Sequence, residues 1–157
     1  MATHTATIEW HRNGAPFLDR RYSREHEWRF DGGAVVPASS SPHVVRVPLS
    51  NPANVDPEEA FVAALSSCHM LWFLDLAARE GYLVEQYTDR AEGRTGRRDK
   101  GTEWIAKAVL APTVRFAGAK KPDDDAVRAL HHRAHEACFI ANSVRTEVSV
   151  EGTWTAP

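Results

Sequence analysis

Two cysteines are the residues of this chain best suited to redox chemistry. Cys68 and Cys138 are the only cysteines among 157 residues. Two thiols that meet in a fold can be oxidised to a disulfide and reduced again, and the thiolate is the reactive form. A chain of this length buries enough apolar surface to fold without a disulfide or a metal. Both cysteines are therefore available for chemistry.

A buried thiol needs a cation to become reactive, and the sequence offers one candidate. Burial favours the neutral thiol, so Cys68 on an apolar helix face would by itself be inert. Alternation along 22–30 places Arg24 and His26 on the inward face of a strand, where a guanidinium remains charged and would favour a nearby thiolate. Glu58 can hold that guanidinium. Structural roles stay open: Arg24 can extend to solvent, Glu58 can serve only the helix dipole, and His26 can be a core histidine.

Two helices are predicted, and each carries one cysteine. Asp56 at the N-cap, Pro57 at the first helical position and acids in the first turn predict a helix from Pro57 to about Glu80, before Gly81. Its apolar stripe comprises Phe61, Leu65, Cys68, Trp72 and Leu76. Aspartates at 123–125 predict the start of a second helix, whose apolar face comprises Val127, Leu130, Ala134 and Cys138.

Strands and turns occupy most of the remaining sequence. The strand-like runs are 6–10, 22–30, 34–36, 44–49, 83–94, 102–116 and 143–150, with a polar turn over 95–101. The early runs favour an antiparallel meander, and the two long ones favour a hairpin. This pattern predicts a single α+β domain over residues 1–157, with antiparallel sheets around two central helices.

The start of the first helix resembles a known family motif. The segment 56–68, which reads DPEEAFVAALSSC, is similar to the central helix of the OsmC/Ohr family of organic hydroperoxide reductases. The match includes the Asp-Pro-Glu-Glu start, the small-residue middle and a cysteine ten residues after Glu58. The segment around Cys138, before the last predicted strand, resembles the element that carries the second family cysteine. The order of elements agrees over almost the whole chain.

The resemblance implies a reaction and an assembly. Cys68 would attack an organic hydroperoxide and become a sulfenic acid, Cys138 would resolve it, and an external dithiol would reduce the resulting disulfide. An arginine and a glutamate steady the thiolate in the family, and Glu58 occupies the glutamate position. The family forms intertwined homodimers with OsmC-like folds, and the resemblance calls for no metal or other cofactor.

The arginine and the second cysteine are less well matched to the family. Arg46 competes with Arg24, but alternation within 44–49 places Arg46 opposite the apolar side chains, so Arg24 is preferred. Phe139 replaces the proline that is usual after the second cysteine. His135, three residues before Cys138, can favour its thiolate near the end of the second helix. We therefore expect Cys68, Cys138, Arg24 and Glu58 to be catalytic and His26 and His135 to be auxiliary.

Two other functions remain open at this point. A zinc site could draw on Cys68, Cys138, His26 and His135, although structural zinc ligands generally come in close sequence pairs. A noncatalytic module could instead bind a small apolar ligand. Whether the protein is such a module or a peroxidase, we expect an apolar pocket for the ligand or substrate. Its walls would be formed by Phe61, Leu65, Trp72 and Phe139.

Composition excludes several partners. With 19 Lys+Arg against 21 Asp+Glu, the net charge of −2 offers no excess of positive charge for nucleic acid. The most apolar run, 60–74, is too short to span a membrane, and the N-terminal residues lack a secretory signal pattern. We expect a cytoplasmic protein whose partners are a second copy of itself, an organic hydroperoxide and a dithiol reductant.

Overall fold

The computed structural model describes residues 1–98 and 101–157. These residues form two compact units, 1–60 and 61–157, and each is described by itself. The turn expected over 95–101 includes residues 99 and 100, which lie outside the described residues. The single domain expected over 1–157 stays a prediction.

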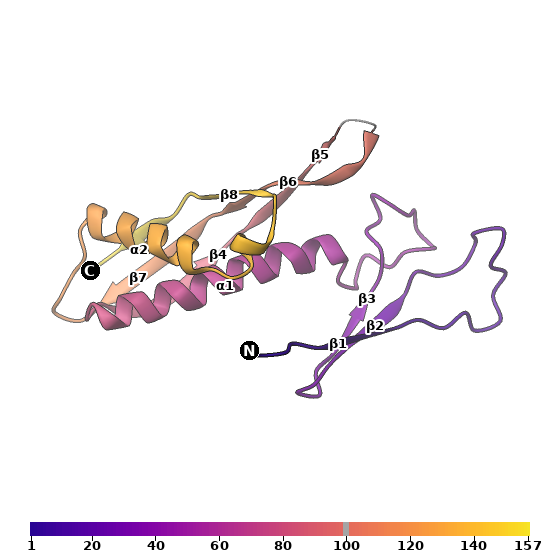
Figure 1. Cartoon of the computed structure of the whole chain (residues 1–157), viewed down its shortest axis with the longest axis horizontal. Helices are drawn as coiled ribbons and strands as arrows, with labels where there is room; N and C mark the ends of the chain where they lie inside the picture. Colours follow the sequence, from indigo (N-terminus) through magenta and orange to yellow (C-terminus); the bar gives the residue numbers. More distant parts are fainter. Residues whose placement is uncertain (99–100) are drawn as a thin grey trace. The chain divides into compact units, whose positions relative to one another are not determined.

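The unit 1–60 contains a three-stranded antiparallel sheet (Figure 1). Its strands are β1 (Ala6–Glu9), β2 (His26–Phe30) and β3 (Val35–Ala38), in the order β1-β2-β3. The predicted meander is confirmed, but β2 begins at His26, so Arg24 lies before the strand. Alternation within the strand therefore does not determine the orientation of Arg24.

The prediction of a strand over 44–49 is wrong, because local turns occupy this segment. The backbone N–H groups of Val44 and Val45 both donate to the carbonyl of Ser41, and that of Leu49 donates to Arg46. Pro48 has no N–H to offer a strand ladder. Without a strand, alternation no longer places Arg46 on either face, and its side chain is exposed.

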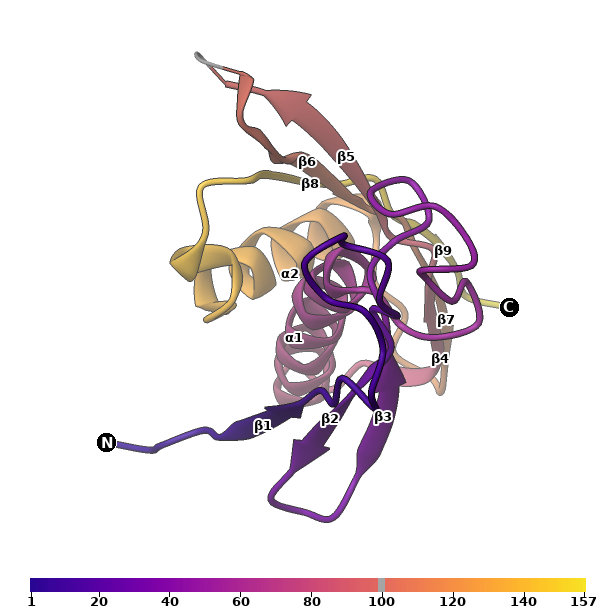
Figure 2. The same ribbon diagram turned by 90° about the vertical axis from the view of Figure 1, so that its right-hand side faces the viewer.

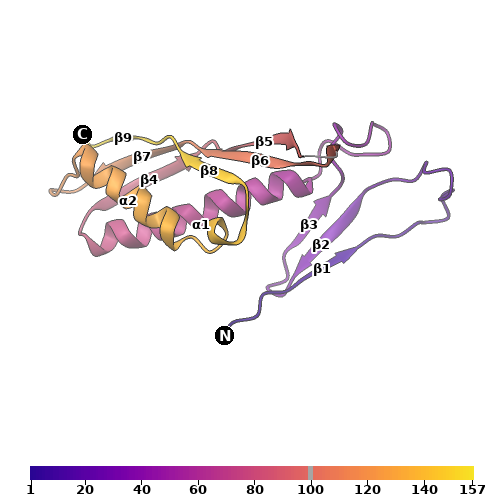
Figure 3. The same ribbon diagram turned by 45° about the horizontal axis from the view of Figure 1, so that its top comes forward.

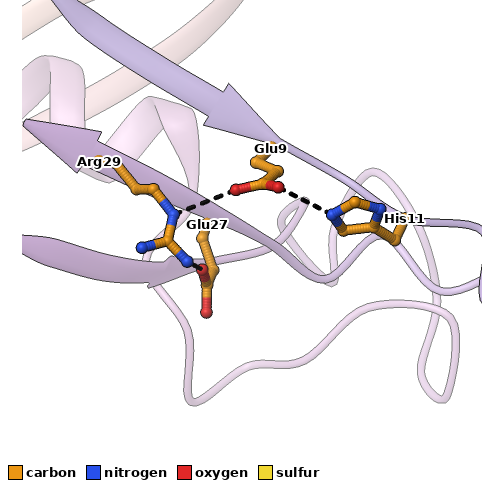
Figure 4. Close-up of polar contacts among 4 residues, drawn as sticks. All are labelled: Glu9, His11, Glu27 and Arg29. Carbon is orange, nitrogen blue, oxygen red and sulfur yellow. Dashed lines mark hydrogen bonds and ion pairs between the residues drawn. The ribbon is translucent and has the colours of Figure 1, made fainter.

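The solvent face of the β1–β2 pair carries a network of charges (Figure 4). Arg29 Nε donates to Glu9 at 3.1 Å, and its Nη2 contacts Glu27, which lies opposite Glu9 in the strand register. His11 Nε2 lies 2.9 Å from the other Glu9 oxygen. The hydrogen bond from His11, followed by that from Arg29, lowers the pKa of Glu9. Glu27 and Arg29 thus form part of a charged, partly exposed face of this strand pair.

Helix α1 (Pro57–Arg79) begins and ends as the sequence predicts. Asp56 Oδ1 accepts from the Glu59 N–H at 2.8 Å, and Glu59 Oε2 accepts from the Asp56 N–H at 3.1 Å, which is a reciprocal capping box. At the other end Gly81 has φ +77°, and the N–H groups of Gly81 and Tyr82 bond to the last turn. A residue with a side chain is disfavoured at that φ, so the glycine ends the helix.

The buried side of α1 is offset by one residue from the predicted stripe. Leu65, His69, Phe73, Leu76 and Ala77 are buried, whereas Cys68 and Trp72 are half-buried. The helix is apolar on most sides, so periodicity alone did not distinguish these two neighbouring lines. By length and composition alone, α1 is also the one helix in the described residues that could cross a membrane.

The unit 61–157 builds two three-stranded sheets from six strands. These are β4 (Leu83–Asp89), β5 (Glu92–Arg97), β6 (Glu103–Leu110), β7 (Pro112–Ala117), β8 (Glu147–Val150) and β9 (Thr153–Thr155). Their orders are β4-β7-β9 and β5-β6-β8. The predicted long hairpin is present as antiparallel β4–β7 and β5–β6 pairs, but β8 and β9 join β6 and β7 in parallel. The sheets are therefore mixed rather than purely antiparallel.

Helix α2 (Asp124–Ala137) packs on the same side of these strands as α1 (Figures 2 and 3). The Asp123 side chain accepts from the Ala126 N–H at 2.8 Å and caps the helix, as predicted. An apolar cluster joins the two helices to β7 and comprises Phe73, Leu76, Ala77, Val114, Phe116, Val127, Leu130 and Ala134. The expected α+β class with two helices is confirmed.

One hydrogen bond in this helix interface joins two buried histidines. His69 Nε2 lies 3.0 Å from His131 Nδ1. His69 is only 1% exposed and His131 only 8% exposed. Burial lowers the pKa of both to about 4, and for His69 the nearby His131 and His135 add to this effect. Both imidazoles are therefore neutral at pH 7, and one ring donates to the other.

Asp89 fixes the point where the chain passes from one sheet to the other. One carboxylate oxygen accepts from the Ala111 N–H at 2.7 Å between β6 and β7, and the other accepts from the Ser66 hydroxyl on α1. The Asp89 side chain thus links α1 to the junction between β6 and β7.

We predict that Asp89→Ala lowers the free energy of unfolding by about 1–3 kcal/mol, because it leaves the Ala111 N–H and the Ser66 hydroxyl without their acceptor. Urea unfolding measures this loss. Glu85→Ala, exposed on the same strand, is the control and should change stability little. Equal losses in both variants would contradict the role given to Asp89.

The buried histidine pair predicts an acid-sensitive fold. Between about pH 4 and about pH 6.5 the unfolded chain binds protons at both histidines while the folded chain does not, so stability falls as the pH is lowered through this range. The loss should be on the order of a few kcal/mol. The free energy of unfolding measured from pH 7.5 to pH 4 in His69→Gln/His131→Gln should vary less than in the unaltered protein. His132→Gln, at an exposed site of α2, should retain the full dependence.

Candidate functional site

The two thiols lie together between α1 and the end of α2. Cys68 is half-buried on α1, and Cys138 is the residue that ends α2 and is 1% exposed. Both are free, and they lie close enough for the Cys68 side chain to raise the pKa of Cys138. Residues far apart in the sequence are thus brought near one another.

The environment of Cys138 favours the protonated thiol. Burial, followed by the contact with Cys68, raises the pKa of Cys138 to about 11. The backbone N–H of Ala141 points at its Sγ at 3.4 Å and works in the opposite direction, as does the Ile140 N–H. These donors belong to the turn that leads into the 3-10 helix Ala141–Ser143. They are oriented toward sulfur because the chain changes direction at Cys138.

Apolar side chains adjoin the thiols. The Trp72 and Phe139 rings meet edge to face with their centroids 5.9 Å apart, and Phe139 is 69% exposed. Trp72 lies one helical turn after Cys68, and Phe139 follows Cys138 directly. This ring pair provides an apolar surface that an organic substrate can contact.

Leu65 and Phe61 pack in a second apolar cluster. Leu65 is 1% exposed and contacts Ala108 and Leu110, and Phe61 packs against the same cluster. Leu65 is therefore enclosed by protein, which leaves it no surface for a ligand. Of the four residues expected to line a substrate pocket, Trp72 and Phe139 are the pair that the structure joins.

Arg24 and Glu58 belong to the unit 1–60, whereas both thiols belong to the unit 61–157. The Arg24 guanidinium lies over the Tyr22 ring, 3.8 Å from its centroid, and donates to the Arg20 and Tyr22 carbonyls. Its side chain is half-buried. Glu58 is exposed in the first turn of α1.

The two auxiliary histidines differ in their surroundings. His26 Nε2 accepts from the Trp28 indole at 2.9 Å, so its Nδ1 carries hydrogen and donates to the Arg24 carbonyl at 2.8 Å. Both ring nitrogens of His26 are therefore engaged. His135 lies close enough to His69 to affect its charge. Within residues 1–98 and 101–157, no three His, Cys, Asp or Glu side chains gather to hold a metal ion.

The His69–His131 pair is the feature that sequence reasoning missed. The run of histidines on the second helix was visible, as was His69 next to Cys68. No pattern indicated that His69 and His131 would bond to each other, because the register between α1 and α2 is set by packing. The available signal was a second helical line on α1, through residues 65, 69 and 73, beside the predicted line through 61, 65, 68 and 72. The structure buries the second line.

Comparison with known proteins identifies the family of this chain. The model of the OsmC-like protein family matches residues 50–152. An OsmC-like protein of unknown function from Vibrio cholerae is 57% identical, with 97% of this chain and 99% of that chain covered and a TM-score of 0.94. No functionally curated protein matches.

More distant solved structures share the fold. An organic hydroperoxide resistance protein from Elizabethkingia anophelis is 17% identical with a TM-score of 0.67, covering 100% of this chain and 98% of that chain. The organic hydroperoxide resistance protein OhrB of Bacillus subtilis is 17% identical with a TM-score of 0.59, and 98% of each chain is covered. The family match over most of the chain, together with the Vibrio cholerae relative, shows that this chain belongs to the OsmC-like protein family.

Proposed function

We propose that the protein is a thiol peroxidase that reduces organic hydroperoxides to alcohols. The observation that carries this proposal is a pair of neighbouring free thiols with unequal exposure, Cys68 half-buried and Cys138 buried. A half-buried sulfur can meet a peroxide, whereas a buried protonated sulfur is kept from direct oxidation. The organic hydroperoxide resistance proteins of the same fold lend family-level support.

The reaction balances over two steps. The Cys68 thiolate attacks the terminal peroxide oxygen, the O–O bond breaks, and the alkoxide takes a proton and leaves as the alcohol. Cys68 is then a sulfenic acid. The Cys138 sulfur attacks the Cys68 sulfur, an S–S bond forms, and the S–O and S–H bonds break to release water. An external dithiol supplies the two electrons that restore both thiols.

The apolar rings beside the thiols support an organic substrate. Trp72 and Phe139 can pack against an alkyl or aryl tail, and such contacts contribute nothing to hydrogen peroxide, which has no carbon. Binding energy from the tail would place the peroxide oxygen against Cys68. We therefore assign organic hydroperoxides, rather than hydrogen peroxide, as the substrate class.

The remaining elements of the proposal are a homodimer and an arginine–glutamate pair. Leu71 on α1 is 63% exposed and Phe139 is 69% exposed, which favours burial of this apolar surface against a second copy. In that intertwined assembly, Arg24 and Glu58 would complete the site of one subunit or the other. The guanidinium would stabilise the Cys68 thiolate, and Glu58 would orient the guanidinium.

We predict that stoichiometric cumene hydroperoxide converts the unaltered protein to an intramolecular Cys68–Cys138 disulfide. In Cys138→Ala the sulfenic acid has no resolving thiol, so Cys68 should accumulate as sulfenic and then sulfinic acid. Mass spectrometry of the intact protein and its peptides distinguishes these products. Cys68→Ser is the control and should consume no peroxide. Undiminished consumption by that control would contradict the peroxidase, and inert thiols in every form would favour a noncatalytic binding module.

We also predict that Arg24→Met slows the reaction of Cys68 with cumene hydroperoxide by about tenfold or more, because the thiolate loses its cation. Arg46→Met is the matched control and should react at the original rate. The rate is measured by stopped-flow fluorescence, and thermal melting confirms that both variants are folded. A slower reaction in Arg46→Met but not in Arg24→Met would reverse the assignment.

A further inference from the structure

The buried histidine pair adjoins the thiol pair at both of its ends. His69 directly follows Cys68 on α1, and His131 precedes Cys138 by two turns of α2. His135 lies between them on α2 and is close enough to His69 to affect its charge. The hydrogen bond between the two imidazoles thus joins the same two elements that carry the two neighbouring thiols.

The rest of this helix interface is mostly apolar. Phe73 and Leu76 of α1 pack with Leu130 and Ala134 of α2. Apolar contacts are non-directional and tolerate small sliding motions, whereas a hydrogen bond at 3.0 Å specifies both distance and angle. Arg133 of α2 also contacts Glu80, the residue that follows α1, but this ion pair is partly exposed. The histidine bond is therefore a buried, directional contact that can fix the register of α1 against α2.

Register matters because a disulfide requires close and oriented sulfurs. The S–S bond is about 2 Å long and its Cα atoms lie about 4.4–6.8 Å apart, whereas one helical turn advances about 5.4 Å. A shift of even part of a turn would separate Cys138 from Cys68. Because His69 and Cys68 are neighbours on one helix, a constraint on His69 also constrains Cys68.

The surroundings of the pair hold it in place. The His131 ring stacks on Phe73, with ring centroids 4.4 Å apart, and it lies nearly parallel to the His69 ring. A Cβ on Gly152 would come within 3.0 Å of His131 Nε2, so a glycine permits this close approach. Arg128 and Glu151 line a cavity on the side of α2 that His131 also reaches. Among residues 1–98 and 101–157, His69 Nδ1 and His131 Nε2 have no partner, so within this part of the chain the rings are bonded only to each other.

We propose that the His69–His131 hydrogen bond is a positioning link that holds Cys138 in register with Cys68 for disulfide formation. This inference rests on the proposed peroxidase and concerns its second step only. Attack of Cys68 on the peroxide needs no contact with Cys138, whereas formation of the S–S bond with loss of water does. The histidines touch no reacting atom in this scheme and act through the helices that carry the sulfurs.

The test separates the two steps of the reaction. His69→Leu and His131→Leu remove the link, whereas His131→Asn offers a polar atom near the position of Nδ1 and should retain it. We expect the leucine variants to consume the first equivalent of cumene hydroperoxide at the original rate. Disulfide formation should be slower by about tenfold, with a matching rise in sulfinic acid at Cys68. His131→Asn should restore the disulfide, and exposed His132→Leu is the control.

A second arm makes the test independent of peroxidase activity. Diamide oxidises dithiols to disulfides without peroxide, so the rate at which it forms the Cys68–Cys138 bond reports the register directly. We expect the leucine variants to be slower and His131→Asn to match the unaltered protein. A normal diamide rate without any peroxide consumption would contradict the proposed function and leave the positioning link supported by its variants.

Two outcomes would overturn the positioning link. One is disulfide formation at the original rate in folded leucine variants, and the other is an equal slowing of both chemical steps. Circular dichroism checks that each variant is folded. If a single leucine variant does not fold because one imidazole is left unpaired, His69→Leu/His131→Leu, which leaves no unpaired ring, is measured in its place.

Discussion

The interface between α1 and α2 places two cysteines and two histidines among apolar side chains. The two imidazoles bond to each other, His69 to His131, and Cys138 lies near Cys68. Each histidine supplies what the other lacks, a donor or an acceptor, provided that both stay neutral. Burial likewise raises the pKa of Cys138, so this thiol and both imidazoles are neutral at pH 7. Polar groups thereby give specificity to an interface that is otherwise apolar.

The unequal exposure of the two sulfurs follows from their places in the helices. Cys68 lies in the middle of α1, on the flank of the buried line. Cys138 ends α2, where the chain turns back and directs the N–H of Ala141 at the sulfur. A mid-helix residue has no such donors, because its neighbours' N–H groups are used within the helix. Position in secondary structure, rather than residue type, therefore distinguishes the two thiols.

Local signals in the sequence predicted local structure well. The capping residues Asp56 and Asp123 and the terminal Gly81 set the helix ends where the structure has them. The segment 44–49 was mispredicted because its β-branched residues suggested a strand while its turn hydrogen bonds are made to Ser41. The parallel pairing of β8 and β9 also escaped prediction, since partner choice depends on how the chain returns after α2.

The candidate site shows the same division between local and non-local information. The family motif identified Cys68 and Glu58 from one contiguous segment, and the meeting of Cys68 with Cys138 followed from the resemblance. The histidine bond joins residues 62 positions apart and depends on helix register, which no local pattern encodes.

The one-residue offset of the buried line bears directly on the proposed chemistry. Successive helical residues point about 100° apart, so His69 in the centre of the buried line places Cys68 at its edge. Had Cys68 occupied the centre, as periodicity suggested, its sulfur would be enclosed between α1 and the strands and closed to a peroxide. The histidine in the adjacent position occupies that enclosed place instead and requires a buried polar partner, which α2 provides in His131. The exposure of the reactive thiol and the existence of the histidine bond are thus two consequences of a single helix rotation.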